Sequence, residues 1–370
     1  MPVSLAKRLK ERIRREGPIT FHDWMKTALY DPAGGYYQKS DLVRWGREGD
    51  YRTSPERSEL FAATFARYFA KLYDELQRPA DWTIVEGGAG DGSFAWSVLQ
   101  TLADRHPAVF EATRYLVCEL SVDGRRRAQE RLVGFGERVQ FCTELPDVER
   151  GLYFSNELLD SFPVHRVVKK DEKSSELYVS VASNGDFEWS FGPLSTTRLT
   201  EFIENYSPRP GDGQIIEINL EIDDWLAQVA NRLTNGFVIT VDYGAEAVEL
   251  YDSTLRPEGT LRAFSRHGFV DDVLAQPGEY DITATVSWTQ VKTVGERLGL
   301  RVVEFASQNK FLLNAGLLEE LEHRMTTTDS DAERARLSTG AREMILPGRM
   351  ASSFQVLVQR RVKEDAANVP

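Results

Sequence analysis

The segment EGGAGDG (residues 86–92) carries three glycines at a spacing that could hold a small ligand. Gly88, Gly90 and Gly92 follow the apolar run WTIV and precede the amphipathic segment SFAWSVL. Residues without a Cβ atom let a backbone turn tightly and approach a ligand within contact distance. Between a strand and a helix, such glycines indicate a ligand-binding turn, and a purely structural turn is the alternative.

The residues around the glycines favour S-adenosylmethionine over a dinucleotide. A dinucleotide fingerprint has the spacing G-x-G-x-x-G, whereas Ser93 stands here in place of its third glycine. Glu86 could accept hydrogen bonds from the ammonium group of S-adenosylmethionine, but it would repel a pyrophosphate. Glu119 ends the next apolar run, YLVCE, where a carboxylate could accept both ribose hydroxyls. We therefore predict that Glu86, the three glycines and Glu119 bind this cofactor.

Polar side chains also follow a later apolar run, in LYFSNELLDSFPV (residues 152–164). Asn156, Glu157 and Asp160 should face the glycine turn, because open α/β sheets bind ligands at the carboxyl ends of their strands. Methyl transfer is an in-line displacement that depends on positioning, and a guanidinium acceptor requires carboxylates around it. We predict catalytic roles for all three, with Glu157 first and Asp160 second as the clamp on the nitrogen. Capping of the following helix is the alternative for both carboxylates.

Other polar residues at strand ends are candidate substrate contacts, each with a structural role as the alternative. They are Asp242, Tyr243 and Gly244 in GFVITVDYG, and Glu217 in IIEIN. His165 and His267 have no partner at metal-ligand spacing, so we predict structural roles for them and no metal site.

The elements that would position these residues begin at Trp82, where short apolar runs alternate with amphipathic segments. This alternation is typical of an α/β fold with a doubly wound, mostly parallel sheet covered by helices on both faces. Residues 1–80 are predicted to form a helical cover around a turn-rich loop. Leu5, Leu9 and Ile13 recur every four residues in a basic segment, which favours an amphipathic helix over a transit peptide.

The predicted core, residues 81–362, is interrupted twice. The first insertion, at about 165–213, contains an Asn-Gly dipeptide at 184–185 that predicts a β-hairpin. The second, at about 245–285, is rich in glycine and proline and shows little periodicity. Residues 363–370 are expected to form a flexible tail.

The composition indicates which classes of partner are disfavoured and in which cellular compartment we expect the protein. The 370 residues carry a net charge of −12, which disfavours a nucleic-acid partner, and no apolar run is long enough to span a membrane. Cys118 and Cys142 each lie in an apolar run and are expected to be buried and reduced, which predicts a cytoplasmic protein. Nothing in the composition indicates an oligomeric state.

Several strings in this chain together resemble the MidA family. They are GPITFHDWMKTALYDPAGGYY (17–37), GDYRTSPERSELFA (49–62), EGGAGDG (86–92), SNELLDSFPVHRV (155–167), VDYG (241–244), GTLRAF (259–264), PGEYDITATVSW (277–288), QNKFLLNAGL (308–317) and LPGRMASSFQVL (346–357). The chain departs from the family at Asp91, where arginine is frequent, and in the wording AFSRHGFVDDVL after Arg262.

The resemblance implies a class I S-adenosylmethionine-dependent methyltransferase fold with a helical lid, and transfer to a protein arginine. The family includes a mitochondrial complex I assembly factor, so the implied protein substrate is a respiratory complex subunit. Residues 35–37 and the string TSPE, with Ser54 and Pro55, are predicted to cover the cofactor. A non-catalytic assembly factor that keeps the cofactor fold is the alternative function. The glycine spacing argues against a nicotinamide oxidoreductase.

Overall fold

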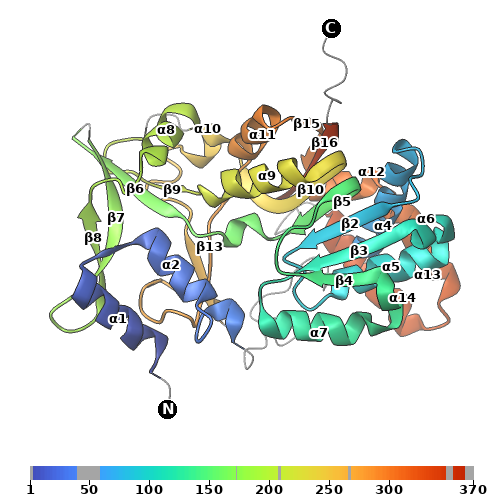
Figure 1. Ribbon diagram of the computed structural model, residues 1–370, viewed down its shortest axis with the longest axis horizontal. Coiled ribbons are helices and arrows are strands. Elements are labelled where there is room, and N and C mark those ends of the chain that lie inside the picture. The colour runs from blue at the N-terminus through green and yellow to red at the C-terminus, as the bar shows by residue number, and fades with distance from the viewer. Residues whose placement is uncertain are drawn as a thin grey trace, which may run out of the picture.

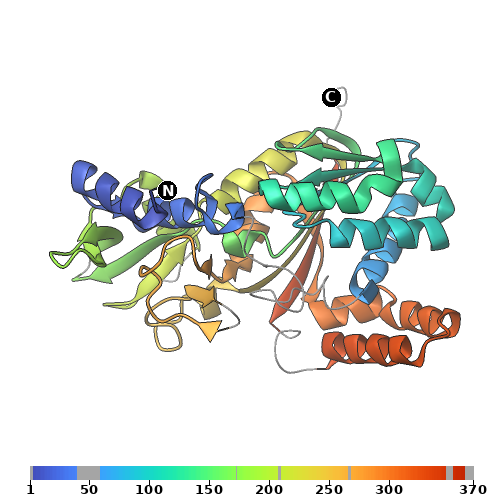
Figure 2. The same cartoon turned by 90° about the horizontal axis from the view of Figure 1, so that it is seen from below.

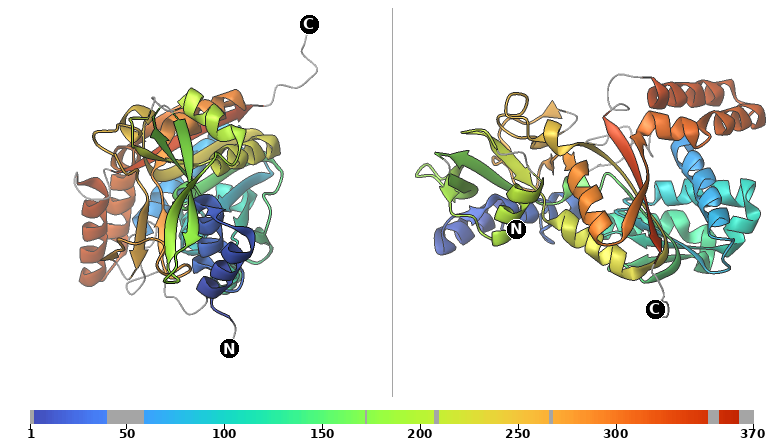
Figure 3. Two further views of the ribbon diagram at one scale, coloured as in Figure 1. Left: turned by 90° about the vertical axis from the view of Figure 1, so that its left-hand side faces the viewer. Right: turned by 90° about the horizontal axis from the view of Figure 1, so that it is seen from above.

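The chain folds into two lobes that lie side by side along the long axis of the molecule (Figure 1). The computed structural model describes residues 3–39, 59–171, 173–206, 210–265, 268–346 and 353–362. The larger lobe holds the main sheet, and the smaller lobe holds a second sheet together with the N-terminal helices (Figure 3). Among the described residues, no helix has the length and apolar character required to cross a membrane.

The main sheet has eight strands, most of them parallel. Its order is β15 (Leu300–Ser307), β16 (Phe354–Val362), β10 (Leu233–Ala245), β5 (Val148–Asn156), β2 (Trp82–Gly87), β3 (Thr113–Cys118) and β4 (Val139–Cys142), and β14 (Val286–Ser287) pairs with the end of β10. Strands β2, β3, β4, β5 and β10 are parallel, whereas β16 runs antiparallel to both of its neighbours. The chain runs outward from β2 to β4 and then returns to β5 on the other side of β2. The carboxyl end of β2 is therefore the topological switch point, where such sheets bind ligands.

Helices cover both faces of the main sheet, as the alternation of the sequence predicts. One face packs against α4 (Glu59–Glu75), α5 (Ser93–Arg105), α6 (Pro107–Ala112), α7 (Val122–Leu132), η2 (Val133–Arg138) and α12 (Gln308–Asn314). Two further helices, α13 (Leu317–Thr327) and α14 (Asp331–Ile345), pack against α4 (Figure 2). The opposite face carries α9 (Glu221–Arg232), α10 (Ala247–Leu250) and α11 (Trp288–Arg297), whereas α8 (Thr197–Tyr206) lies toward the second sheet (Figure 1).

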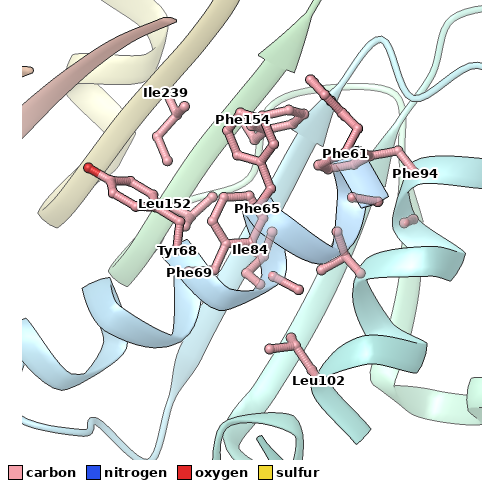
Figure 4. Close-up of a cluster of buried hydrophobic side chains, with 14 of the residues drawn as sticks. Phe61, Phe65, Tyr68, Phe69, Ile84, Phe94, Leu102, Leu152, Phe154 and Ile239 are labelled. Atoms are coloured by element: carbon pink, nitrogen blue, oxygen red, sulfur yellow. The ribbon is translucent and has the colours of Figure 1, made fainter. Parts of the chain in front are cut away.

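The first of these faces has an aromatic core in which α4 is central (Figure 4). Phe65 of α4 lies 5.1 Å from Phe154 of β5, and Phe154 stacks on Phe94 of α5 at 4.4 Å between ring centroids. All three rings are almost fully buried. The sequence predicts that residues 1–80 form one helical cover, but α4 instead belongs to the core of the main sheet, because its phenylalanines fill the space between strands and helices.

The second sheet is antiparallel and carries the N-terminal helices. Its order is β1 (Ile19–Thr20), β7 (Lys173–Val181), β6 (His165–Lys170) and β9 (Ile215–Ile218), and β8 (Phe187–Gly192) pairs with β7. The predicted hairpin is present between β7 and β8, with Gly185 at φ +89°. Because β9 pairs with β6, this sheet extends past the predicted insertion end at 213.

The N-terminal helices pack on that second sheet. Helix α1 (Leu5–Glu16) buries Leu5, Leu9 and Ile13, as their spacing predicts, and Ser4 caps it by accepting a hydrogen bond from an amide of its first turn. Helix α2 (Phe21–Tyr30) and the short helix η1 (Tyr36–Gln38) follow. A small sheet of the second insertion, β11 (Arg262–Ser265), β12 (Gly268–Phe269) and β13 (Asp281–Thr283), shares their apolar core.

The two cysteines differ from the sequence prediction. Cys118 and Cys142 are paired as a disulfide between β3 and β4, and both are only half-buried. They are register partners in the parallel pair, which brings their Cα atoms to 4.9 Å. The prediction of separate, reduced and buried thiols is therefore wrong for this structure, because it rests on local sequence and cannot show that two strands are neighbours.

Candidate active site

The glycine turn lies at the carboxyl end of β2, at the switch point of the main sheet. Gly88, Gly90 and Gly92 have φ values of +70°, +56° and +76°, in the left-handed region that side chains with a Cβ atom disfavour. A Cβ atom on Gly92 would lie 2.9 Å from the Cβ of Ala128, so this glycine also lets α7 pack against the turn. Asp91 accepts a hydrogen bond from the Ser93 amide at 3.0 Å, which caps the start of α5.

Glu119 lies directly beside this turn, at the end of β3. Its Oε2 accepts a hydrogen bond from the Gly90 amide at 2.8 Å, and its Oε1 accepts one from the Ser121 amide at 2.6 Å. The Gly88 amide donates to the carbonyl of Cys118 at 2.9 Å and thereby joins the ends of the same two strands. The Gly90 and Ser121 amides therefore orient the Glu119 carboxylate beside the turn.

Glu86 is buried beneath the turn rather than displayed on it. The Tyr115 hydroxyl donates to its Oε2 at 2.8 Å, and only 5% of the residue is exposed. Burial raises the pKa of Glu86 to about 8, against the opposing effect of the Tyr115 hydrogen bond. A nearby cation would favour the ionised form, which is the effect expected of an ammonium group. Sequence reasoning missed Tyr115, because its role depends on the pairing of β2 with β3.

Asn156 and Glu157 follow β5 on the other side of β2. Glu157 has a φ of +50°, which is unusual for a residue with a side chain, and its amide donates to the carbonyl of Val241 at 2.9 Å. The Asn156 Nδ2 donates to Glu157 Oε1 at 3.2 Å. The neighbouring strand β10 thus holds Glu157 in a strained backbone conformation of the kind that gathers at functional sites.

Asp160 is buried in the short helix η3 (Leu159–Ser161), next to Asp242 from the end of β10. Asp242 Oδ2 accepts hydrogen bonds from the amides of Leu159 at 3.0 Å and Asp160 at 3.4 Å. Asp242 rather than Asp160 therefore caps this helix, contrary to the alternative role considered for Asp160. Burial raises the pKa of Asp242 to about 7, against the hydrogen bonds from backbone amides.

The Asp160 side chain is buried at this end of the sheet among other acids. It is 5% exposed, and its Oδ1 has no hydrogen-bond partner among the described residues. Burial raises its pKa well above the usual range, and the charges of Asp242, Glu157 and Asp281 raise it further, against a hydrogen bond from the Tyr243 side chain that lowers it. Asp281 comes from β13 and was missed by sequence reasoning, because 120 residues of chain separate it from Asp160. This end of the sheet therefore gathers four acids, and the neutral form of Asp160 is favoured there unless a cation lies beside it.

Two of the other candidates have structural partners. Glu217 forms a buried ion pair with Arg166 at 3.0 Å and accepts a hydrogen bond from the Thr260 amide at 2.6 Å. The His165 ring hydrogen-bonds Glu176 at 2.7 Å and stacks on His22, as expected for a structural histidine. Both lie in the second sheet, away from the glycine turn.

The remaining candidates lie at the end of β10 or outside the described residues. A Cβ atom on Gly244 would lie 2.4 Å from the Trp288 indole nitrogen, so this glycine makes room for packing. The Tyr243 ring lies 5.7 Å from the guanidinium of Arg262, and burial, together with the charge of Asp160, raises the pKa of Tyr243. His267, Ser54 and Pro55 fall outside the described residues.

The N-terminal segment, residues 3–39, reaches this same end of the sheet. The Gln38 side chain donates to the carbonyl of Leu120, the residue after Glu119, at 3.4 Å. The Tyr37 hydroxyl donates to Asp281 at 2.6 Å, and the Tyr30 hydroxyl donates to the carbonyl of Ser161 at 3.0 Å. A Cβ atom on Gly35 would lie 2.4 Å from the Asp31 amide, so the turn between these two tyrosines has no room for a side chain.

Comparison with known proteins identifies the family. Residues 64–306 match a family of S-adenosyl-L-methionine-dependent methyltransferases. The mitochondrial protein arginine methyltransferase NDUFAF7 homolog of Drosophila melanogaster is 30% identical over 80% of this chain and 71% of its own length. The Bos taurus protein arginine methyltransferase NDUFAF7, also mitochondrial, is 26% identical over 95% of this chain and 82% of its own length.

The prediction of a cytoplasmic location is wrong by this comparison, because these relatives are mitochondrial proteins.

A solved structure supports both the fold and the ligand. A Burkholderia thailandensis protein, crystallised with S-adenosyl-homocysteine, superimposes with a TM-score of 0.86 at 30% identity, over 98% of this chain and 93% of its own. The described site suits the same class of ligand. The turn has left-handed glycines, the Gly90 amide holds the Glu119 carboxylate beside it, and the Glu86 carboxyl is buried beneath it. The predicted cofactor, S-adenosyl-L-methionine, is confirmed for this family.

Proposed function

This chain belongs to the MidA family of S-adenosyl-L-methionine-dependent methyltransferases, and from that premise we propose that it methylates arginine in a protein substrate. The observation that carries the proposal is the buried Asp160 carboxylate, whose Oδ1 has no described hydrogen-bond partner and which lies among other acids. A buried carboxylate in such surroundings is stabilised by a cation, and a guanidinium matches a carboxylate in charge and in planar geometry. The names of the Drosophila and Bos taurus relatives support the same acceptor.

The cofactor, when bound, supplies a methyl group on a sulfonium sulfur. The residues of this chain place the acceptor nitrogen in line with that methyl group. The new N–C bond forms as the S–C bond breaks, and one proton must leave the nitrogen. Glu157 follows the end of β5, where its amide donates to the carbonyl of Val241, and we assign it the clamp on the nitrogen. Asp160 holds the guanidinium charge and is the group to which the proton passes. Asn156 orients Glu157 through its amide.

The N-terminal segment acts as the lid in this proposal. Gln38, one residue before the end of the described range 3–39, contacts the residue after Glu119, so this segment reaches the edge of the cofactor turn. Exclusion of water around a sulfonium and its acceptor strengthens every electrostatic interaction there. The lid and the two insertions would also supply the contacts to the protein substrate.

Transfer of labelled methyl groups tests the proposed function. The purified chain is incubated with tritium-labelled S-adenosyl-L-methionine and a mitochondrial extract, because the family resemblance predicts a respiratory complex subunit as substrate. Hydrolysed protein is then analysed for methylated arginine. We expect label in methylarginine with the wild type, and none above background with Gly90→Val. Binding of S-adenosyl-homocysteine without any methylated product would instead favour the non-catalytic assembly factor.

A further inference from the structure

Asp281, in the second insertion, lies against the buried acids of the proposed acceptor site. Strand β13 begins at Asp281 and contacts η3, and the Ala284 amide donates to the carbonyl of Asp160 at 2.9 Å. Asp281 is 4% exposed, and its charge acts on both Asp160 and Tyr30. Three separate parts of the chain, η3, the end of β10 and the second insertion, therefore bring carboxylates together.

This arrangement has an open acceptor. Asp160 Oδ1 is buried and has no hydrogen-bond partner among the described residues, whereas Asp242 is occupied by backbone amides. Buried carboxylates that lie close together raise the free energy of the protein unless a cation or a proton compensates them. Arg262 lies next to this cluster, with its guanidinium 5.7 Å from the centre of the Tyr243 ring.

Two tyrosines of the N-terminal segment close on the residues that flank the acids. Tyr37 donates to Asp281 Oδ1 at 2.6 Å, and Tyr30 donates to the carbonyl of Ser161, the residue after Asp160, at 3.0 Å. The two rings lie 5.4 Å apart and contact each other. Asp281 is thus held between the second insertion, which carries it, and the N-terminal segment, which orients it.

We propose that Asp281 is a specificity-determining carboxylate of the acceptor site, oriented by Tyr37, so that the site selects a cationic side chain only when the N-terminal segment is docked. The inference rests on the proposed function for the identity of the acceptor as a guanidinium. Selection of the acceptor is then shared between the main sheet, the second insertion and the N-terminal segment.

Binding of two matched probes to the full chain tests this proposal. N-acetyl-arginine amide and its neutral isostere N-acetyl-citrulline amide are titrated into protein saturated with S-adenosyl-homocysteine. We expect the wild type to bind the arginine probe at least tenfold more tightly than the citrulline probe. Asp281→Asn should lose most of that ratio while its affinities for S-adenosyl-homocysteine and for the citrulline probe stay unchanged. Asp271→Asn, exposed in the same insertion, is the matched control and should keep the ratio.

Tyr37→Phe provides a second variant that leaves every carboxylate in place. We expect it to lower the ratio several-fold, because it removes only the hydroxyl that orients Asp281. A wild type that binds both probes equally, or an Asp281→Asn variant that keeps the full ratio, would overturn the proposal. Absence of methylarginine in the extract experiment together with an intact probe ratio would overturn the proposed function but leave this cation site standing.

Discussion

The Gly90 amide and the Glu119 carboxylate lie 2.8 Å apart, and this hydrogen bond joins the turn after β2 to the end of β3. The contact orients the carboxylate that we expect to accept the ribose hydroxyls. Glu119→Ala should therefore weaken binding of S-adenosyl-homocysteine by about 100-fold, since it removes charged acceptors from two hydroxyls. Calorimetric titration measures the change, with Glu204→Gln, exposed on α8, as the control. An unchanged affinity of Glu119→Ala for S-adenosyl-homocysteine would contradict the assignment. So would a wild type that binds NAD more tightly than S-adenosyl-homocysteine.

Gly92 should be sensitive to the smallest side chain. Its φ is +76°, and a Cβ atom would lie 2.9 Å from Ala128, so Gly92→Ala combines backbone strain with overlap against α7. We expect a loss of about 2–4 kcal/mol in the free energy of unfolding, measured by urea denaturation. Gly134→Ala is the matched control, because nothing lies within 4 Å of a Cβ atom there. Equal stability of the two variants would show that the turn and α7 are not tightly packed.

Glu157 offers a way to separate activity from stability. Its φ of +50° favours glycine, so Glu157→Gly should fold with a free energy of unfolding within about 1 kcal/mol of the wild type. Both Glu157→Gly and Glu157→Gln should lower kcat by about 100-fold or more, because the clamp on the nitrogen is lost. Methylarginine formation and S-adenosyl-homocysteine affinity are measured side by side. A fully active Glu157→Gln variant would remove this residue from the mechanism.

Glu86 should make the cofactor-free protein less stable as pH rises. Burial raises its pKa from 4.5 to about 8, so the folded state binds more protons than the unfolded state between these values. The stability that Glu86 contributes is fully present below pH 4.5 and is lost as pH rises through about 8. Glu86→Gln keeps an acceptor for Tyr115 and cannot ionise. Its melting temperature should exceed that of the wild type at pH 8.5 and match it near pH 5, and a constant difference would contradict this account.

Local sequence was sufficient for the parts of the site that lie within one strand-turn-helix unit. The glycines and Glu119 could be placed because their spacing and the flanking apolar runs report directly on one β-α-β segment. Asp281 could not be placed from the sequence, because its proximity to Asp160 depends on how the second insertion folds back onto η3. The pairing of Cys118 with Cys142 depends in the same way on strand order.

Local sequence is not sufficient for Glu217 and for helix α4, because the residues that surround them come from other parts of the chain. Glu217 follows an apolar run like the site residues do, yet its partner Arg166 comes from the neighbouring strand of the second sheet and neutralises it. Helix α4 lies before Trp82 in the sequence, and this position alone predicts that it belongs to the N-terminal cover. Its almost uninterrupted apolar character, from Leu60 to Phe69, would have been the signal that it is buried on several sides.

Strand β16 lies between β10 and β15 in the main sheet, although it is synthesised after every other described strand. Its residues Val356, Leu357 and Val358 are completely buried, and it supplies the hydrogen-bond partners for both neighbours. Until it emerges from the ribosome, β10 exposes an unpaired edge, and β15 has no strand to join. The nascent chain is therefore open to aggregation until β16 has been synthesised, and a truncation before Phe354 leaves the sheet permanently split.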